Sequence, residues 1–225
     1  MSIYEQSLRY LGWRGQALEP ELERDLQAVI IECERLAQPR FVWRSFSFSC
    51  KEDEIKLANT AFAFNSRSLV GLLKNASEAA LMAVTLGQRL EIELQRLGQS
   101  NVSHAVMLDA VASAMVESVC DDAEREIGRY AEQNKLTPLP RFSPGYGDWE
   151  LSSQPMLLSI LNANRRIGLS CTSSNLLLPQ KSVTALVGLL PESAVANISI
   201  SSSCKGCVGA EKCGYSSCIL LNNEV

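Results

Sequence analysis

The chain has 225 residues, of which 46% are hydrophobic, so it can bury a sizeable core as one domain or as one domain with a small appendage. This composition excludes an intrinsically disordered protein. The formal net charge of −4, without a basic stripe in the sequence, argues against a nucleic-acid-binding protein.

The N-terminus reads Met-Ser-Ile-Tyr-Glu-Gln-Ser and lacks the charged-then-apolar pattern of a secretory signal. The longest apolar run, residues 105–120, carries Asp109 and Glu117. It is also shorter than the roughly 20 residues that a membrane-spanning helix needs. We therefore expect a cytoplasmic protein without a membrane segment, in which thiols stay reduced unless they serve metal or redox chemistry.

Residues 20–37 are predicted to form a helix, because a proline and two acidic residues open the segment and apolar residues follow at helical spacing. Phenylalanine and cysteine alternate with serine in residues 41–50, which predicts a strand. Next along the chain we expect a short helix, a buried strand that ends at a glycine, and an amphipathic helix, at residues 68–74, 79–86 and 88–97.

Ser103 is predicted to cap a long helix that reaches about residue 133, with small apolar residues in its first half and a charged, water-facing second half at 121–132. A loop rich in proline and glycine follows. Beyond it we expect a helix at 155–167 and strands at 169–173, 182–190 and 197–201. Helices and strands are grouped without regular βαβ alternation, which predicts an α+β fold with a mainly antiparallel twisted sheet and flanking helices.

The loop contains Arg-Phe-Ser-Pro-Gly-Tyr-Gly-Asp-Trp at residues 141–149. Pro144 fixes φ and Gly145 permits a positive φ, so the pair predicts a tight turn. Arg141 offers a guanidinium fork that suits a carboxylate, and Tyr146 offers a flat face with a polar tip. The segment therefore suits a small anionic or zwitterionic ligand. The alternative is an aromatic surface turn without a ligand.

Three acidic residues are candidates for the same site. Asp148 has the reach for a ribose hydroxyl, or it caps the turn through its own backbone. Glu117 lies on an otherwise apolar stretch and needs a partner, which is Arg141, another arginine or a ligand, because an unpaired buried charge is costly. Asp109 falls on a similar helical face, and we expect it to pair with a lysine or arginine. The single histidine, His104, is interpreted as a capping or surface residue, and no hydrolase triad or nucleotide-binding motif accompanies it.

Four of the eight cysteines occur within 15 residues, with spacing C-x2-C-x5-C-x4-C, at Cys204, Cys207, Cys213 and Cys218. Four thiolates suit a zinc ion or an iron–sulfur cluster, and free or redox-active thiols are the alternative. We therefore divide the chain into a domain at 1–200 with a helical N-terminal part and a Cys-rich metal-binding or redox tail at 201–225. The remaining cysteines are predicted to be core residues: Cys33, Cys50, Cys120 and Cys171.

The pattern Arg-x-x-Pro-Gly-Tyr at 141–146 resembles the S-adenosylmethionine-binding motif of the activation domain of cobalamin-dependent (vitamin B12-dependent) methionine synthase. The Gly-Asp-Trp continuation is similar to stand-alone relatives of that domain. Segments 83–87, 108–117 and 172–183 look like the strand end, the long small-residue helix and the strand–turn–strand of those relatives, in the same order. The resemblance covers roughly residues 68–200.

The resemblance implies an α+β activation-domain fold and S-adenosylmethionine as a cofactor. It also implies a cofactor-binding set of Glu117, Arg141, Pro144, Gly145, Tyr146 and Asp148. Glu117 would hold the ammonium end of the ligand. The chain departs from the family at 191–195, where the full-length enzyme has aromatic residues near the ligand, and no counterpart of that enzyme's N-terminal acidic ligand residue is evident.

The function implied is reactivation in trans of a methionine synthase or related corrinoid methyltransferase, because the chain has no recognisable cobalamin-binding segment of its own. The partner would carry cobalamin, and an electron donor together with the methyl group of S-adenosylmethionine would restore methylcobalamin from cob(II)alamin. This role needs positioning of the methyl group and no acid–base catalyst. Two alternatives stay open: a scaffold that docks to a corrinoid protein, and a small redox protein that works through its Cys-rich tail.

Overall fold

The computed structural model describes residues 1–195. Its residues cluster into two compact units, each assembled from separate stretches of the chain. Unit 1 comprises Met1–Trp43, Met82–Arg125 and Gln154–Thr184, and unit 2 comprises Arg44–Leu81, Glu126–Ser153 and the described residues from Ala185 to Val195. The predicted strand at 197–201, the boundary near residue 200 and the four clustered cysteines lie outside the described residues.

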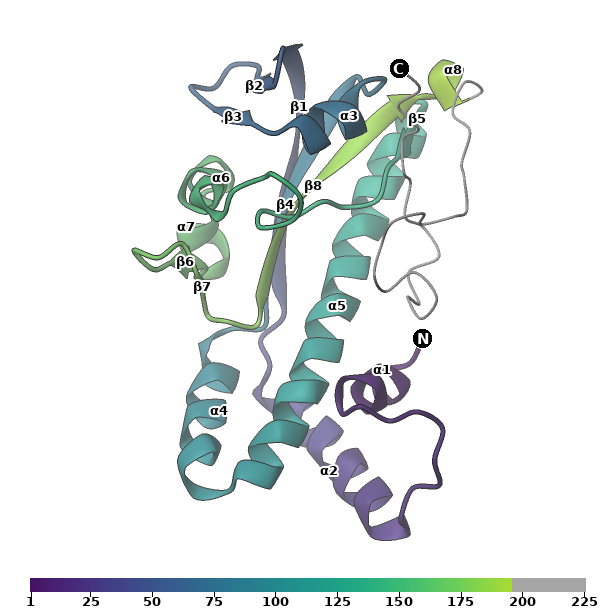
Figure 1. The fold of residues 1–225 in the computed structure, drawn as a ribbon, viewed down its shortest axis with the longest axis vertical. Coiled ribbons are helices and arrows are strands. Elements are labelled where there is room, and N and C mark those ends of the chain that lie inside the picture. Colours follow the sequence, from purple (N-terminus) through teal and green to yellow (C-terminus); the bar gives the residue numbers. More distant parts are fainter. Residues whose placement is uncertain (196–225) are drawn as a thin grey trace. The chain divides into compact units, whose positions relative to one another are not determined.

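Unit 1 is mainly helical (Figure 1). It contains α1 (Ile3–Tyr10), α2 (Pro20–Leu36), α4 (Gln88–Ser100), α6 (Gln154–Leu161), α7 (Ala163–Ile167), the short pair β6 (Ser170–Cys171) and β7 (Leu177–Leu178), and the first part of α5 (Val102–Gln133). Helix α2 packs on α5, where the sulfur of Cys33 lies 3.9 Å from that of Met115. His104 Nε2 lies 2.6 Å from Glu32 Oε2 and joins the same two helices.

Unit 2 holds β2 (Glu54–Leu57), β3 (Ala63–Asn65), α3 (Arg67–Leu73), β5 (Leu136–Pro138), the 3-10 turn η1 (Leu151–Ser153) and α8 (Glu192–Val195). The carboxylate of Glu78 accepts hydrogen bonds from the hydroxyls of Ser45 and Tyr130, so it ties the C-terminal part of α5 to two strands of this unit. Burial and the hydrogen bond with Glu78 raise the pKa of Tyr130.

A six-stranded sheet runs in the order β3-β2-β1-β4-β8-β5, with β1 (Arg40–Lys51), β4 (Glu78–Thr85) and β8 (Ser182–Pro191) contributing residues to both units. The pairs β1–β2, β2–β3 and β5–β8 are antiparallel. Strands β4 and β8 are buried over almost their whole length, because most of their residues are apolar and do not alternate with polar ones. The predicted α+β fold with an antiparallel sheet is confirmed.

Local chemistry explains where elements begin and end differently from the prediction. Asn101, and not Ser103, caps α5, since Asn101 Oδ1 accepts the backbone N–H of His104 at 3.2 Å. The single helix predicted at 155–167 is two helices, because Asn162 adopts a left-handed conformation with φ of 52°. Helix α1 was not predicted, although Ser2 and Glu5 form a capping box at its start.

Of the four cysteines predicted to be core residues, two are buried and two are not. Cys33 and Cys120 are buried, but Cys50 is exposed and Cys171 is only partly buried. Cys50 lies near the end of β1, opposite Ile55 of the short β2, whereas Cys33 faces α5. Burial raises the pKa of the Cys33 thiol to about 12, so this thiol stays protonated and packs as a small apolar side chain.

Helix α5 is longer than the apolar run that the sequence analysis considered. It has 32 residues and is long and apolar enough to cross a membrane by length and composition alone. The core helix of a globular protein meets the same two criteria. Leu108, Val111, Cys120 and Ile127 of α5 are fully buried.

The break between α6 and α7 generates a prediction about stability. Asn162 is exposed, so its backbone conformation and not its packing should decide the effect of a substitution. We expect Asn162→Ala to lower the free energy of unfolding by about 1 kcal/mol, because alanine is strained at a positive φ. Asn162→Gly should stay within about 0.5 kcal/mol of the wild type. Urea unfolding measures both, and equal losses in the two variants would contradict the backbone explanation.

Candidate functional site

The candidate site is the loop at 141–149, which lies in unit 2 and is held to β8 at its start. Phe142 forms an antiparallel bridge with Leu186, in which each residue donates its N–H to the carbonyl of the other at 2.8 Å. Just before the loop, Leu139 donates its backbone N–H to the carbonyl of Gly188 at 2.8 Å. The buried strand β8 therefore fixes the position at which the loop begins.

Three backbone hydrogen bonds close the turn predicted at Pro144 and Gly145. Tyr146 N donates to Ser143 O at 3.2 Å, Trp149 N donates to Tyr146 O at 3.1 Å, and Gly145 N donates to Trp149 O at 2.6 Å. Gly145 has a φ of 95°, as the prediction of a positive φ requires. The main chain of the loop is therefore internally hydrogen-bonded and folds back on itself.

Gly147 brings the loop against the start of α3. Its φ is 56°, and a Cβ at this position would lie 2.8 Å from Ser68 Oγ and 3.3 Å from Phe142 Cζ. The positive φ favours glycine here, and any larger residue would also require the Ser68 hydroxyl to move. The approach of loop to helix depends on residues about 80 positions apart, so the sequence pattern alone did not reveal it.

Asp148 caps helix α3. Its Oδ1 accepts from Ser66 Oγ at 2.6 Å and from the backbone N–H of Ser68 at 3.1 Å, while its Oδ2 accepts from the backbone N–H of Arg67 at 2.7 Å. These donors, the Ser66 hydroxyl foremost, hold the pKa of Asp148 well below its usual range. The predicted alternative, a cap on its own turn, is wrong, because the carboxylate is turned toward a different segment.

Two neighbouring aromatic residues of the loop have opposite environments. Trp149 is only 1% exposed, and its ring centroid lies 5.4 Å from that of Phe64 and 6.3 Å from that of Phe142. Its indole Nε1 has no hydrogen-bond partner among residues 1–195. Tyr146 is 67% exposed, with its ring centroid 6.4 Å from that of Phe142. The loop is thus anchored by Trp149 and presents Tyr146 to solvent.

The other predicted ligand residues are placed as follows. Pro144 is buried, and Arg141 is partly buried at the start of the same loop. Glu117 is partly buried on α5 and belongs to unit 1, whereas the loop belongs to unit 2. The structure thus gathers five of the six predicted residues in one loop, because they are neighbours in sequence. A ligand-binding role for all six stays a prediction.

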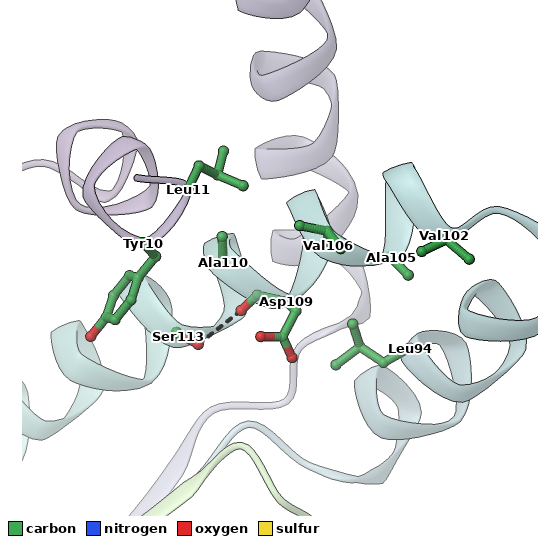
Figure 2. Close-up of a pocket in the computed structure, with 9 residues that line it drawn as sticks. All are labelled: Tyr10, Leu11, Leu94, Val102, Ala105, Val106, Asp109, Ala110 and Ser113. Atoms are coloured by element: carbon green, nitrogen blue, oxygen red, sulfur yellow. Dashed lines mark hydrogen bonds between the residues drawn. The ribbon is translucent and has the colours of Figure 1, made fainter. Parts of the chain in front are cut away.

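Asp109 pairs with a lysine, as predicted. Lys181 Nζ lies 2.8 Å from Asp109 Oδ1 and donates to Ser113 Oγ at 2.9 Å. Asp109 and Ser113 also line a pocket of about 360 Å³ in unit 1 that is otherwise mainly apolar, together with Tyr10, Leu11, Leu94, Val102, Ala105, Val106 and Ala110 (Figure 2). The ion pair therefore gives Asp109 a structural partner at the edge of this pocket.

No group of three or more His, Cys, Asp or Glu side chains suited to a metal ion occurs within residues 1–195. The predicted metal ligands Cys204, Cys207, Cys213 and Cys218 lie outside that range. Metal binding by the four cysteines stays a prediction.

The cap on α3 predicts a pH-dependent contribution to stability. We expect Asp148→Asn to lower the free energy of unfolding by about 1 kcal/mol at pH 7. The folded-state pKa of Asp148 is lowered, so its contribution is fully present above the unfolded pKa of about 3.9 and is lost as the pH falls toward the folded pKa. The difference between mutant and wild type should therefore shrink below about pH 4 in urea unfolding.

The matched control is Asn101→Ala, which removes a cap that does not titrate. The difference in free energy of unfolding between Asn101→Ala and the wild type should stay nearly constant from pH 7 to pH 3. If the loss of unfolding free energy in Asp148→Asn is equally independent of pH, the carboxylate charge contributes nothing to the cap.

Comparison with known proteins identifies a solved structure with a similar fold. No protein-family model matches the chain, and no curated protein matches it. Among solved structures, the chain is similar to the one described as "Crystal Structure of the MetH Reactivation Domain bound to AdoHcy", with a TM-score of 0.58 and 17% sequence identity. The match covers 85% of this chain and 77% of that chain. The chain therefore has the fold of the MetH reactivation domain.

Proposed function

We propose that the chain binds S-adenosylmethionine through the loop at 141–149. Two independent observations support this proposal. The loop carries the Arg-x-x-Pro-Gly-Tyr pattern of S-adenosylmethionine-binding activation domains. The fold is shared with a reactivation domain bound to AdoHcy, which is the molecule that remains when S-adenosylmethionine gives up its methyl group. The observation that carries the proposal is this pattern in a tightly hydrogen-bonded turn on that fold.

The side chains suit the parts of this ligand. The Arg141 guanidinium is a planar fork that matches the ligand's carboxylate. Tyr146 is exposed and offers an aromatic face for the adenine ring or a hydroxyl for a polar group. From the resemblance of α5 to the long helix of the activation domain, we also assign the ligand's ammonium group to Glu117. Pro144 and Gly145 contribute by shaping the turn.

The role that follows is reactivation in trans of a cobalamin-dependent methionine synthase or a related corrinoid methyltransferase. In this reaction an external donor supplies one electron to cob(II)alamin on the partner. The partner's cobalt would then accept the methyl group of the sulfonium, with S-adenosylhomocysteine as the leaving group. The task of this chain is to hold the sulfonium in line with the cobalt, which is an effect of proximity and orientation. The reactive centre belongs to the partner.

Calorimetric titration of S-adenosylmethionine into the purified protein tests the binding step. We expect saturable binding that Arg141→Ala weakens by about 10- to 100-fold, because a hydrogen-bonded charge is lost. Glu117→Gln should weaken it in the same direction. Arg129→Ala is the matched control, since Arg129 is an exposed arginine of the same unit outside the loop.

Failure of the folded wild-type protein to bind, alone and with a corrinoid partner present, would rule out the ligand and favour a docking scaffold. If binding occurs, the next assay adds the protein to a methionine synthase that lacks its own activation domain, together with an electron donor. Recovery of activity that depends on Arg141 would support reactivation in trans.

The cysteine cluster generates a separate prediction. We expect the protein purified without oxygen to contain zinc, or iron and sulfide, in stoichiometric amount. Replacing Cys204 and Cys207 by serine should abolish that content, whereas Cys50→Ser, at an exposed cysteine outside the cluster, should leave it unchanged. Elemental and sulfide analysis of the three proteins decides between the metals. A wild-type protein without stoichiometric metal would remove the metal-binding assignment.

A further inference from the structure

We propose that Asp148 is a positioning residue for the ligand loop and that it acts through the loop backbone without touching the ligand. The proposal rests on the proposed function for its effect on ligand binding. A ribose hydroxyl was one of two partners expected for Asp148, but both oxygens of its carboxylate are turned toward the first turn of α3.

Three consecutive residues hold one end of the loop against neighbouring structure. Gly147 lies so close to Ser68 that a Cβ would require the Ser68 hydroxyl to move, Asp148 accepts three hydrogen bonds from residues 66–68, and Trp149 is buried beside Phe64 and Phe142. Of these attachments, only that of Asp148 is a set of directional hydrogen bonds to a charged acceptor, which are stronger than neutral ones. Asp148 therefore fixes the orientation of this end of the loop.

The orientation is transmitted to the predicted ligand residues by the main chain. Tyr146 lies two residues before Asp148, and its carbonyl accepts the N–H of Trp149 at 3.1 Å. The carbonyl of Trp149 accepts the N–H of Gly145 at 2.6 Å, so the turn closes on the residue that directly follows Asp148. At the other end, the Phe142–Leu186 bridge is fixed by β8. The exposed Tyr146 is thus positioned by two anchors, of which Asp148 is the one that titrates.

Arg67 contributes its backbone to this anchor. Its side chain pairs with Asp53 at 2.9 Å, while its backbone N–H donates to Asp148 at 2.7 Å. The Ser66 hydroxyl donates to Asp148 and accepts from the N–H of Leu69 at 3.1 Å. Ser66 therefore connects the loop anchor with the cap of α3, and it provides a second position at which the anchor can be removed.

The first test uses hydrogen exchange in the ligand-free protein. We expect Asp148→Asn and Ser66→Ala each to lower the protection of the amides of Gly145, Tyr146 and Trp149 by about fivefold or more, because opening of the loop becomes easier. Asn101→Ala, which removes the cap of another helix, should leave these amides unchanged. Unchanged protection of the loop in the Asp148 and Ser66 variants would overturn the proposal. The use of two positions keeps the test decisive if one variant does not fold.

The second test separates positioning from contact with the ribose. Affinities of wild type, Asp148→Asn and Ser66→Ala are measured for S-adenosylhomocysteine and for its analogue that lacks both ribose hydroxyls. Positioning predicts about a tenfold loss in both variants and of equal size for both ligands. A loss confined to the ligand with ribose hydroxyls would mean direct contact and would overturn the proposal. The proposal would also be overturned if both variants kept the wild-type affinity for the ligands while hydrogen exchange in the loop had changed.

The two hypotheses fail in different ways. If the wild-type protein binds neither ligand, alone and with a corrinoid partner present, the proposed function is wrong, and hydrogen exchange still decides whether Asp148 sets the conformation of the loop. If the wild type binds and exchange in the loop does not respond to Asp148→Asn and Ser66→Ala, the proposed function stands and the positioning role is wrong.

Discussion

Contact between the Asp148 carboxylate and the first turn of α3 is the interaction on which the candidate site depends. A helix begins with backbone N–H groups that have no partner inside the helix, and a carboxylate satisfies them with its charge as well as its lone pairs. Here the same carboxylate belongs to a loop that is distant in sequence from the helix. Capping of α3 and ordering of the loop are therefore one event.

The rest of the site follows from this constraint. Glycine suits position 147 because the backbone there comes close to Ser68. Trp149, two residues later, is buried beside Phe64 and Phe142. The residues nearer the turn remain outside this packing, and Tyr146 is exposed as a result. A rigid base with an exposed tip is the arrangement expected of a loop that binds a small molecule.

The fold is shared with the MetH reactivation domain at only 17% identity, so few of the individual side chains are the same. At this identity, two chains can still share which positions along the sequence are apolar and buried. Strands β4 and β8 are mostly apolar, and α5 supplies fully buried positions such as Leu108, Val111 and Ile127. Such patterns tolerate exchange of one apolar residue for another when volume is preserved. The similarity therefore shows a shared fold, and the ligand chemistry proposed for this chain depends on the loop at 141–149.

The sequence by itself determined the features that depend on neighbours along the chain. Helical spacing located α2, apolar runs located β4 and β8, and Pro144 with Gly145 located the tight turn. Tertiary structure decided what depends on distant partners: Asp148 caps α3, Lys181 pairs with Asp109, and Cys50 is exposed although its local pattern resembles that of a core strand. The break at Asn162 was also missed, because a left-handed asparagine leaves the apolar periodicity on both sides intact. Periodicity reports which face of an element is apolar, but a hydrogen bond or ion pair between distant segments is set by the packing of the whole chain.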